Sequence, residues 1–183
     1  MNQQLRLFVG IFPRRATQEL LNQKAKNLSQ QLETQIRILA PEVLHLTVKF
    51  IGNVSETQSE DFKAAFLQAR GSLPCASLQI ENFQLFPSRR KPRVLAAAIE
   101  RSPELDDIFQ FFNRSFNHLG IVAEKRSFNP HITVGRSRFW QKETIFTAPV
   151  QLNEPITSVA LVRSQLTPQG AKYNIIASVG LPT

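Results

Sequence analysis

One strand–helix–strand pattern occurs twice along the 183 residues, at nearly the same spacing. The first strand of each half begins near Arg6 or Arg93, an offset of 93 − 6 = 87. A later strand of each half carries His45 or His131, an offset of 131 − 45 = 86. Repetition of one plan at one spacing predicts two similar lobes with a pseudo-two-fold axis between them. No Pro/Gly/Ser-rich linker separates the halves, so we expect residues 1–183 to form a single two-lobed domain.

Apolar periodicity and breaker residues predict the elements of both halves. Ser55 and Ser102 are typical helix caps, and Gly71 and Gly120 are typical stops for the helices that follow them. Gly52 and Asn53 are expected to end the first histidine strand. The predicted helices are 16–32 and the two capped segments, and the predicted strands are 5–12, 43–51, 77–86, 93–100, 128–134, 156–163 and 173–181.

The two histidine strands read His45-Leu46-Thr47-Val48 and His131-Ile132-Thr133-Val134. Side chains two residues apart on a strand point to the same face. Each histidine therefore shares a face with its threonine, and the apolar residues between them face a core. The alternative is two His–Thr pairs on the solvated faces of ordinary strands, which polar alternation also permits.

With these motifs the chain resembles the two-histidine (2H) phosphoesterase superfamily, and within it the RNA 2',3'-cyclic phosphodiesterases, also labelled 2'-5' RNA ligases. The segments that carry the resemblance are RLFVGIFP, HLTVKFIG, FQLFPSRRKPRVL, FNPHITVGR and the closing VRSQLTPQG-KY. The resemblance implies an α/β (α+β) bilobal fold. In it, two pseudo-two-fold-related lobes place antiparallel sheets along a central cleft, with helices outside.

The resemblance also implies a role for each motif residue. His45 is the proton donor and His131 the proton acceptor, and Thr47, Thr133 and Arg136 bind phosphate. Two histidines with an ordinary pKa near ~6.5 can hold opposite protonation states at neutral pH, as opening a cyclic phosphodiester requires. Phe50 matches an aromatic position near the nucleobase. On an ideal strand, however, a residue five positions after His45 would face away, so only a bulge or the strand's end would turn it toward a base.

Composition favours a polyanionic partner. The 22 Lys and Arg against 14 Asp and Glu give a formal net charge of +8, which favours RNA ends or 2',3'-cyclic nucleotides, although charge can also serve solubility alone. The basic loop 87–92 with Arg93 could follow an RNA backbone or be an ordinary charged loop. Metal-ligand spacing and a glycine-rich phosphate loop are missing, so we expect neither a metal nor a cofactor.

The same composition predicts the setting in which the protein acts. Cys75 is the single cysteine, which excludes an intramolecular disulfide. The N-terminal residues do not form a signal peptide, and no apolar stretch is long enough for a bilayer. We therefore expect a cytoplasmic monomer without membrane association.

The sequence predicts an enzyme that hydrolyses RNA 2',3'-cyclic phosphate ends to 2'-phosphomonoesters. The reverse reaction, ATP-independent 2'-5' joining of RNA, remains open because one site can serve both directions. Other superfamily members open small cyclic nucleotides or ADP-ribose cyclic phosphate. A third possibility is a non-catalytic, basic RNA-binding module.

Overall fold

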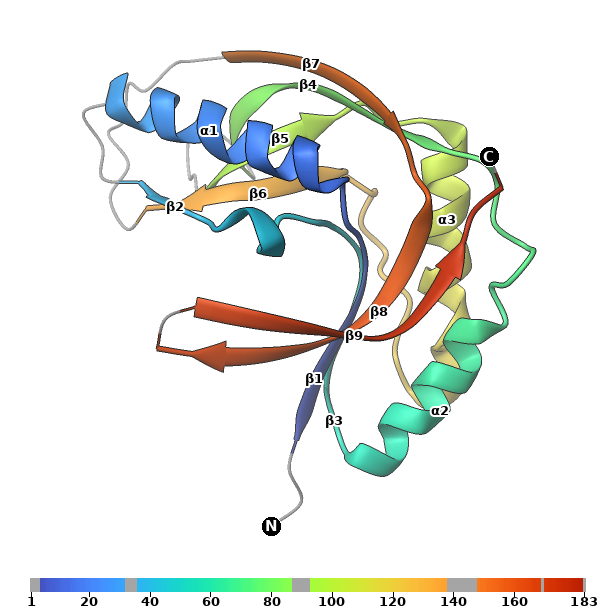
Figure 1. Cartoon of the computed structure of the whole chain (residues 1–183). Coiled ribbons are helices and arrows are strands. Elements are labelled where there is room, and N and C mark those ends of the chain that lie inside the picture. The colour runs from blue at the N-terminus through green and yellow to red at the C-terminus, as the bar shows by residue number, and fades with distance from the viewer. Residues whose placement is uncertain (1–3, 32–35, 87–92, 138–147, 169, 183) are drawn as a thin grey trace.

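The computed structural model describes residues 4–31, 36–86, 93–137, 148–168 and 170–182. Over these residues the chain forms a curled antiparallel sheet of nine strands, three α-helices and two short 3-10 helices (Figure 1). In chain order they are β1 (Leu5–Ile11), α1 (Arg15–Gln31), β2 (Arg37–Ile38), η1 (Pro41–Val43), β3 (Leu46–Val54), α2 (Glu56–Leu67), β4 (Ser77–Phe86), β5 (Val94–Ile99), α3 (Pro103–Ser115), η2 (Asn117–Leu119), β6 (His131–Arg136), β7 (Ala148–Pro155), β8 (Ser158–Thr167) and β9 (Gly170–Gly180).

The sheet consists of two equivalent halves. Its strand order is β7-β4-β5-β6-β3-β1-β8-β9, with β2 added beside β6. The first lobe contains β3, β1, β8 and β9, and the second contains β6, β5, β4 and β7. A pseudo-two-fold axis between β3 and β6 exchanges β1 with β5 and β8 with β4. The predicted bilobal α/β fold is confirmed, with the sheets of both lobes joined into one.

Each lobe is covered by a helix that follows a strand of the other lobe. Helix α1 follows β1 of the first lobe but packs against β6, β2 and β7. Helix α3 follows β5 of the second lobe but packs against β3, next to α2. The apolar stripes of the helices join the sheet in one core, and their members include Leu21, Ala25, Phe62, Phe66, Ile108 and Phe112. The core therefore spans both lobes.

The predicted N-terminal caps are confirmed, but the predicted stops are not the helix ends: α2 ends at Leu67, before Gly71, and α3 ends at Ser115, with η2 between it and Gly120. Ser55 accepts a hydrogen bond from the Gln58 backbone N–H at 3.1 Å, and the Gln58 side chain accepts one from the Ser55 N–H at 2.9 Å. Ser102 accepts one from the Leu105 N–H at 3.2 Å. Gly120 adopts the left-handed conformation, with φ of 84°, directly after η2. These contacts satisfy backbone donors that a first helical turn leaves unpaired.

The structure corrects several predicted strand limits. Strand β3 does not end at Gly52 and Asn53 but continues to Val54, because β1 pairs with it along its whole length. Strand β6 starts at His131 rather than at 128, and residues 41–43 form a 3-10 turn. The short β2 and the whole of β7 were not predicted. Pro149 and Pro155 mask the alternation of β7, which lies at the edge of the sheet, where prolines are tolerated. The basic loop 87–92 lies outside the described residues.

Candidate functional site

The two histidine motifs meet at the centre of the sheet, where the lobes join. Leu46 of β3 pairs with Ile132 of β6, and the strands run antiparallel. This direction places the His45 end of one motif beside the Thr133 end of the other. Leu46 and Ile132 are buried in the core, as are Val48 and Val134. The predicted division of each motif into a core face and a histidine face is confirmed.

A β-bulge follows the threonine of each motif. In β3, Thr47 pairs with Gly10 and Lys49 pairs with Val9, so Val48 is the extra residue. Val48 and Lys49 are both buried, and Phe50, 51% exposed, emerges on the face of Thr47. Because of this bulge, Phe50 lies on the same face as the histidine motif, although an ideal strand would turn it away.

The second motif has the same bulge at the same position. Thr133 pairs with Ala96 and Gly135 pairs with Leu95, so Val134 is the extra residue. Gly135 is packed tightly, because a Cβ there would lie 2.7 Å from Cγ2 of Ile36. Arg136 is exposed and emerges on the face of Thr133. Arg136 and Phe50 therefore occupy equivalent positions in the two lobes, one a cation and the other an aromatic ring.

Both imidazoles are held in the same tautomer. Nδ1 of His45 lies 2.8 Å from the Val43 carbonyl oxygen, and Nδ1 of His131 lies 2.9 Å from that of Asn129. A carbonyl oxygen only accepts, so each Nδ1 carries the proton and donates. Each Nε2 is then the ring nitrogen that can accept a proton, as an acid–base group requires. Thr47 Oγ1 lies 3.1 Å from Nε2 of His45 and donates to it when the ring is neutral.

Three aromatic rings surround His45. The ring centroids of Phe8, Phe12 and Tyr173 lie 4.7, 5.4 and 5.1 Å from that of His45, with Tyr173 edge-on. Burial among them lowers the pKa of His45 to about 4, the Val43 carbonyl acts in the opposite direction, and the charges of His131 and Arg136 lower it further. His45 is therefore neutral at pH 7 in the free protein.

His131 lies in a different setting. Among the described residues, its ring stacks on one aromatic side chain, that of Phe86 of β4, with centroids 3.8 Å apart and planes at 21°. Burial lowers the pKa of His131, and the hydrogen bond to Asn129 opposes that shift. The two imidazoles therefore have the same backbone geometry and unequal surroundings.

A cavity of about 780 Å³ opens beside the histidine face. Three residues that line the cavity also contact or follow the histidine motifs. The Val43 carbonyl accepts the His45 hydrogen bond, the Tyr173 ring contacts the His45 ring, and Arg136 follows Thr133 in β6. Burial raises the pKa of the Tyr173 phenol, against the effect of Arg136 and Arg6, so the phenol stays neutral. The cavity lies between β2 and η1 on one side and the end of the β8–β9 hairpin on the other.

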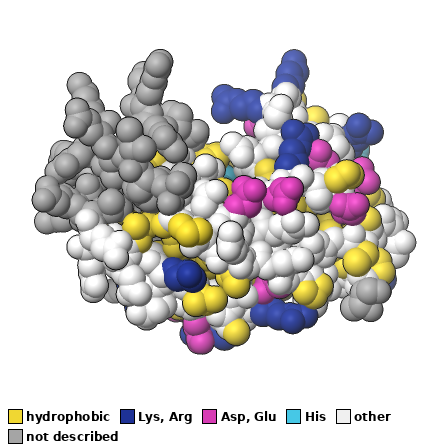
Figure 2. Space-filling view, turned by 90° about the horizontal axis from the view of Figure 1, so that it is seen from above, with side chains coloured by type: hydrophobic (Ala, Val, Ile, Leu, Met, Phe, Trp, Pro, Cys, Tyr) yellow, Lys and Arg dark blue, Asp and Glu magenta, His cyan; other side chains and the backbone are white. Residues whose placement is uncertain are grey.

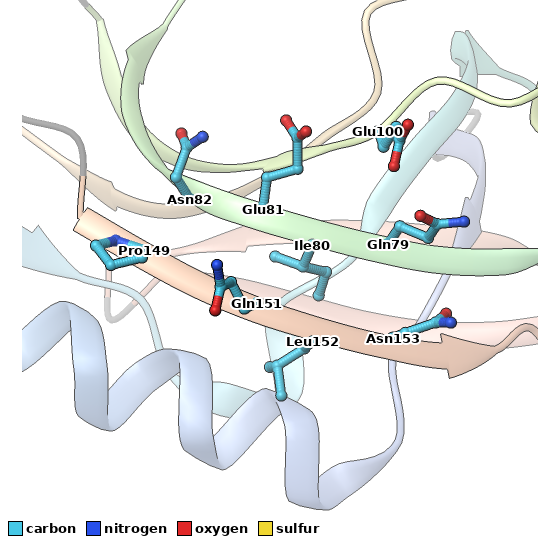
Figure 3. Close-up of a pocket in the computed structure, with 9 residues that line it drawn as sticks. All are labelled: Gln79, Ile80, Glu81, Asn82, Glu100, Pro149, Gln151, Leu152 and Asn153. Atoms are coloured by element: carbon cyan, nitrogen blue, oxygen red, sulfur yellow. The ribbon is translucent and has the colours of Figure 1, made fainter.

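A second cavity, of about 500 Å³, lies between β4 and β7 (Figure 3). Glu81, Asn82 and Glu100 project to the same side there, and none of its lining residues is a histidine. Figure 2, which looks from above the view of Figure 1, shows Asp and Glu side chains near the middle of that face. Two carboxylates would repel a phosphate, so the cavity beside the histidines is the better phosphate site.

The described part of the chain holds no cluster of three or more His, Cys, Asp or Glu side chains that could bind a metal ion. The same residues contain no helix that is both long enough and apolar enough to cross a membrane.

Several residues of the site were not singled out from the sequence. Gly10 lets the His45 ring approach β1, because a Cβ there would lie 3.3 Å from Cδ2 of His45 and 3.0 Å from Cε2 of Phe8. Phe8, Phe12 and Phe86 were not distinguished from the other phenylalanines among the 14 in the sequence. Only the alternation within RLFVGIFP could have placed Phe8 and Phe12 on one face.

Comparison with known proteins identifies relatives over most of the chain. The model of the family described as LigT like Phosphoesterase matches residues 11–96. A Thermotoga maritima protein named RNA 2',3'-cyclic phosphodiesterase is 26% identical over 144 residues, which cover 75% of each chain. A Bacillus subtilis protein of the same name is 26% identical over 159 residues, covering 87% of this chain and 85% of the relative.

Solved structures share the fold. The protein TT0787 of Thermus thermophilus superposes with a TM-score of 0.82 at 25% identity, covering 96% of this chain and 97% of that one. Escherichia coli LigT, crystallised with 3'-AMP, superposes with a TM-score of 0.80 at 20% identity, covering 99% and 100% of the two chains. Both structures therefore share the fold of this chain.

Proposed function

Since the chain belongs to the LigT-like phosphoesterases of the 2H superfamily, we propose that it hydrolyses RNA 2',3'-cyclic phosphodiester ends to 2'-phosphomonoesters. The observation that carries the proposal is the pairing of two His–Thr motifs on one face, with both Nδ1 atoms fixed on backbone carbonyls. Curated relatives that bear the name RNA 2',3'-cyclic phosphodiesterase support the same substrate.

The reaction divides between the two histidines. His131 Nε2 takes a proton from water as the water oxygen attacks phosphorus, and the bond from phosphorus to the 3' oxygen breaks. His45 Nε2 gives its proton to that leaving oxygen, which departs as a hydroxyl. Thr47, Thr133 and Arg136 stabilise the non-bridging oxygens, where charge develops in the transition state. Phe50 contacts the terminal nucleobase, since the bulge places it on the same face.

The donor role requires that His45 gain a proton together with the substrate. In the free protein, burial lowers the pKa of His45 to about 4, and the charges of His131 and Arg136 add to that shift. A bound phosphate anion offsets those cationic charges and favours the imidazolium. At neutral pH, the donor role therefore depends on a bound phosphate that favours the charged form of His45.

Neither a metal nor a cofactor takes part in the proposed mechanism. We also propose that residues 1–183 act as a monomeric two-lobed domain in the cytoplasm. A core that includes residues of both lobes supports the single domain, and the free Cys75 thiol is compatible with a reducing compartment.

The decisive experiment combines turnover with leaving-group rescue. The protein is assayed in EDTA, without ATP, on an RNA oligonucleotide with a 2',3'-cyclic end, and the product is identified as a 2'-phosphomonoester. His45→Ala and His131→Ala are each expected to lower kcat about 10²–10⁴-fold with little change in substrate affinity. A substrate whose 3' leaving group is acidic enough to need no proton rescues His45→Ala and leaves His131→Ala slow.

Three results would contradict parts of the proposal. Binding of RNA without any turnover would indicate that the protein is a non-catalytic, basic RNA-binding module. Activity that is lost in EDTA and restored by one divalent metal would exclude the two-histidine mechanism. A 3'-phosphate product, or the opposite rescue pattern, would reverse the roles of the histidines while keeping the pair.

A further inference from the structure

We propose that the cavity beside the histidines binds the phosphate on the 5' side of the terminal nucleoside, so that the enzyme acts on RNA strands in preference to free cyclic mononucleotides. The inference rests on the proposed function and adds a binding position for the next phosphate of the strand. It starts from the position of three cationic side chains, Arg37, Arg136 and Lys172, around one cavity.

Two of these cations lie directly opposite one another. Arg37 of β2 pairs with Arg136 of β6 in the antiparallel register, which places their side chains on one face. An anion bound between two such side chains is attracted by both positive charges. Lys172 of β9 adds a third positive charge from the other side of the cavity.

The hairpin that carries Lys172 comes close to Arg37. A Cβ on Gly170 would lie 3.1 Å from Nη2 of Arg37, so the guanidinium packs against the hairpin backbone. Figure 1 shows the end of the β8–β9 hairpin extending from the sheet on the side where β2 and η1 lie. Cations from two separate elements thus face one space. The single carboxylate on its described lining, that of Glu42, lies 3.5 Å from Nη1 of Arg15.

The cavity has the size and lining of a nucleotide site. Its volume of about 780 Å³ falls within the range of about 300–1,000 Å³ that small-molecule pockets occupy. Leu166, 73% exposed, and the half-buried Ile38 and Tyr173 provide apolar surface beneath the charges. The base and ribose of the nucleotide that precedes the terminal one can lie on such a surface while the phosphate between the two contacts the rim.

A second phosphate position follows from the number of charges. The cyclic phosphate at the histidines is held by the two threonines and Arg136, in the proposed mechanism. Arg37 and Lys172 add positive charge where a further phosphate would meet the lining of the cavity. A 2',3'-cyclic mononucleotide with a free 5' hydroxyl carries one phosphate, whereas an RNA end carries the next phosphate one nucleoside away. An RNA end therefore occupies both positions, as does a cyclic mononucleotide that carries a 5' phosphate, whereas a cyclic mononucleotide with a 5' hydroxyl occupies only one.

The test compares kcat/KM for three substrates that have the same terminal nucleoside. The first is the 2',3'-cyclic mononucleotide with a 5' hydroxyl, the second carries a 5' phosphate, and the third is a dinucleotide whose internucleotide linkage is an uncharged methylphosphonate. We expect the 5'-phosphorylated substrate to exceed the first at least about five-fold, as a charge-assisted contact implies. The methylphosphonate is expected to lose most of that advantage.

Lys172→Gln identifies the cavity as the source of the preference. Lys172 is exposed and has no role in the proposed chemistry, so the variant should leave kcat/KM for the 5'-hydroxyl substrate unchanged. It should lower kcat/KM for the 5'-phosphorylated substrate about three- to five-fold and reduce the salt slope for RNA by about 0.7. Lys26→Gln on α1 removes the same charge from an exposed position outside the cavity lining and should change neither.

The outcomes separate the subsite from the function on which it rests. Turnover of all three substrates at equal kcat/KM would overturn the subsite and keep the proposed function. A preference for the 5' phosphate that survives Lys172→Gln and Arg37→Gln would place the phosphate elsewhere and also overturn the inference. Turnover of none would overturn the proposed function itself.

Discussion

Gly10 is the residue at which the packing around His45 leaves least room. A Cβ would meet Phe8, the Leu46 carbonyl oxygen and the His45 ring at 3.0 to 3.3 Å. Gly10→Ala therefore pushes the imidazole by a few tenths of an ångström, and we expect kcat to fall roughly tenfold, because small displacements of a reacting group are costly. Gly180→Ala in β9 is the control, since its Cβ would meet only Thr157 O at 3.8 Å. Equal kcat in the two variants would show that Gly10 does not position His45.

The aromatic surroundings of His45 also predict how stability depends on pH. The unfolded chain binds a proton at His45 near pH ~6.5, while the folded chain does so only near pH 4. The unfolded state therefore holds more protons between these values, and the free energy of unfolding falls as pH drops through that window, by at most about 3 kcal/mol. The lowered pKa of His131 acts in the same direction. Urea unfolding at pH 7 and 4.5 measures the loss, and His45→Gln should reduce it.

Protonation should accompany ligand binding for the same reason. A phosphate anion beside His45 raises its pKa from about 4, so binding near pH 6 takes up a proton from the buffer. Calorimetric titration of inorganic phosphate in two buffers with different ionisation enthalpies measures this uptake. We expect a value approaching one proton in the wild type and a much smaller one in His45→Gln. Zero uptake in the wild type would contradict the donor role of His45.

The bulges in β3 and β6 mark where sequence-based prediction of the site stops. Strict alternation correctly placed each histidine beside its threonine on one face and buried the apolar residues between them. The same alternation turns Phe50 and Arg136 away, because each lies five residues after its histidine. The extra residue of each bulge arises from the pairing of β3 with β1 and of β6 with β5. The sequence of β3 or β6 alone does not specify that pairing. The resemblance, rather than periodicity, supplied those two positions.

A buried network fixes the first bulge to α3. Lys49, 5% exposed, donates to Asn113 Oδ1 at 2.8 Å and to the Val122 carbonyl oxygen at 3.1 Å. Asn113 also accepts from the Glu124 N–H at 2.7 Å and donates to its carbonyl at 3.0 Å. The network therefore links β3 to the segment that leads toward β6.

Removing the acceptor of this network should cost more than removing its cation. Asn113→Leu leaves the buried ammonium of Lys49 without that partner and is expected to lower the free energy of unfolding by about 3 kcal/mol. Lys49→Met replaces the cation with an apolar side chain of similar length and is expected to cost about 1 kcal/mol. Urea denaturation compares them. A larger loss for Lys49→Met than for Asn113→Leu would mean that the hydrogen bonds of the ammonium stabilise the fold by more than its burial destabilises it.

At the scale of the whole molecule, the helices were easier to predict than the lobe against which each helix packs. The caps at Ser55 and Ser102 were predicted from the sequence, and the structure confirms them. Nothing in the stripe of a helix specifies which lobe it covers, so the exchange of α1 and α3 between lobes was not anticipated. Strand β7 was missed because an edge strand with two prolines lacks clear alternation.

The overall charge predicts how RNA binding responds to salt. With a net charge of +8 and three cations around one cavity, affinity should fall as salt rises, because each neutralised phosphate releases counterions. For single-stranded RNA we expect the logarithm of affinity to fall with the logarithm of salt with a slope of about −2, or about 0.7 per cation. Fluorescence titration of a non-hydrolysable oligonucleotide from low to high salt measures it. An affinity that does not change with salt concentration would mean that uncharged contacts dominate RNA binding.

The pairing of β1 between β3 and β8 has a consequence during synthesis on the ribosome. Gly10 pairs with Thr47 on one side and with Ala160 on the other, which is made 160 − 10 = 150 residues later. Synthesis proceeds at about 5–20 residues per second, so the edge of β1 that pairs with β8 stays unpaired for roughly 8 to 30 s. An apolar edge such as this is a template for pairing with other nascent chains. The protein should therefore depend on chaperones that hold emerging chains more than a protein of its size built from local hairpins does.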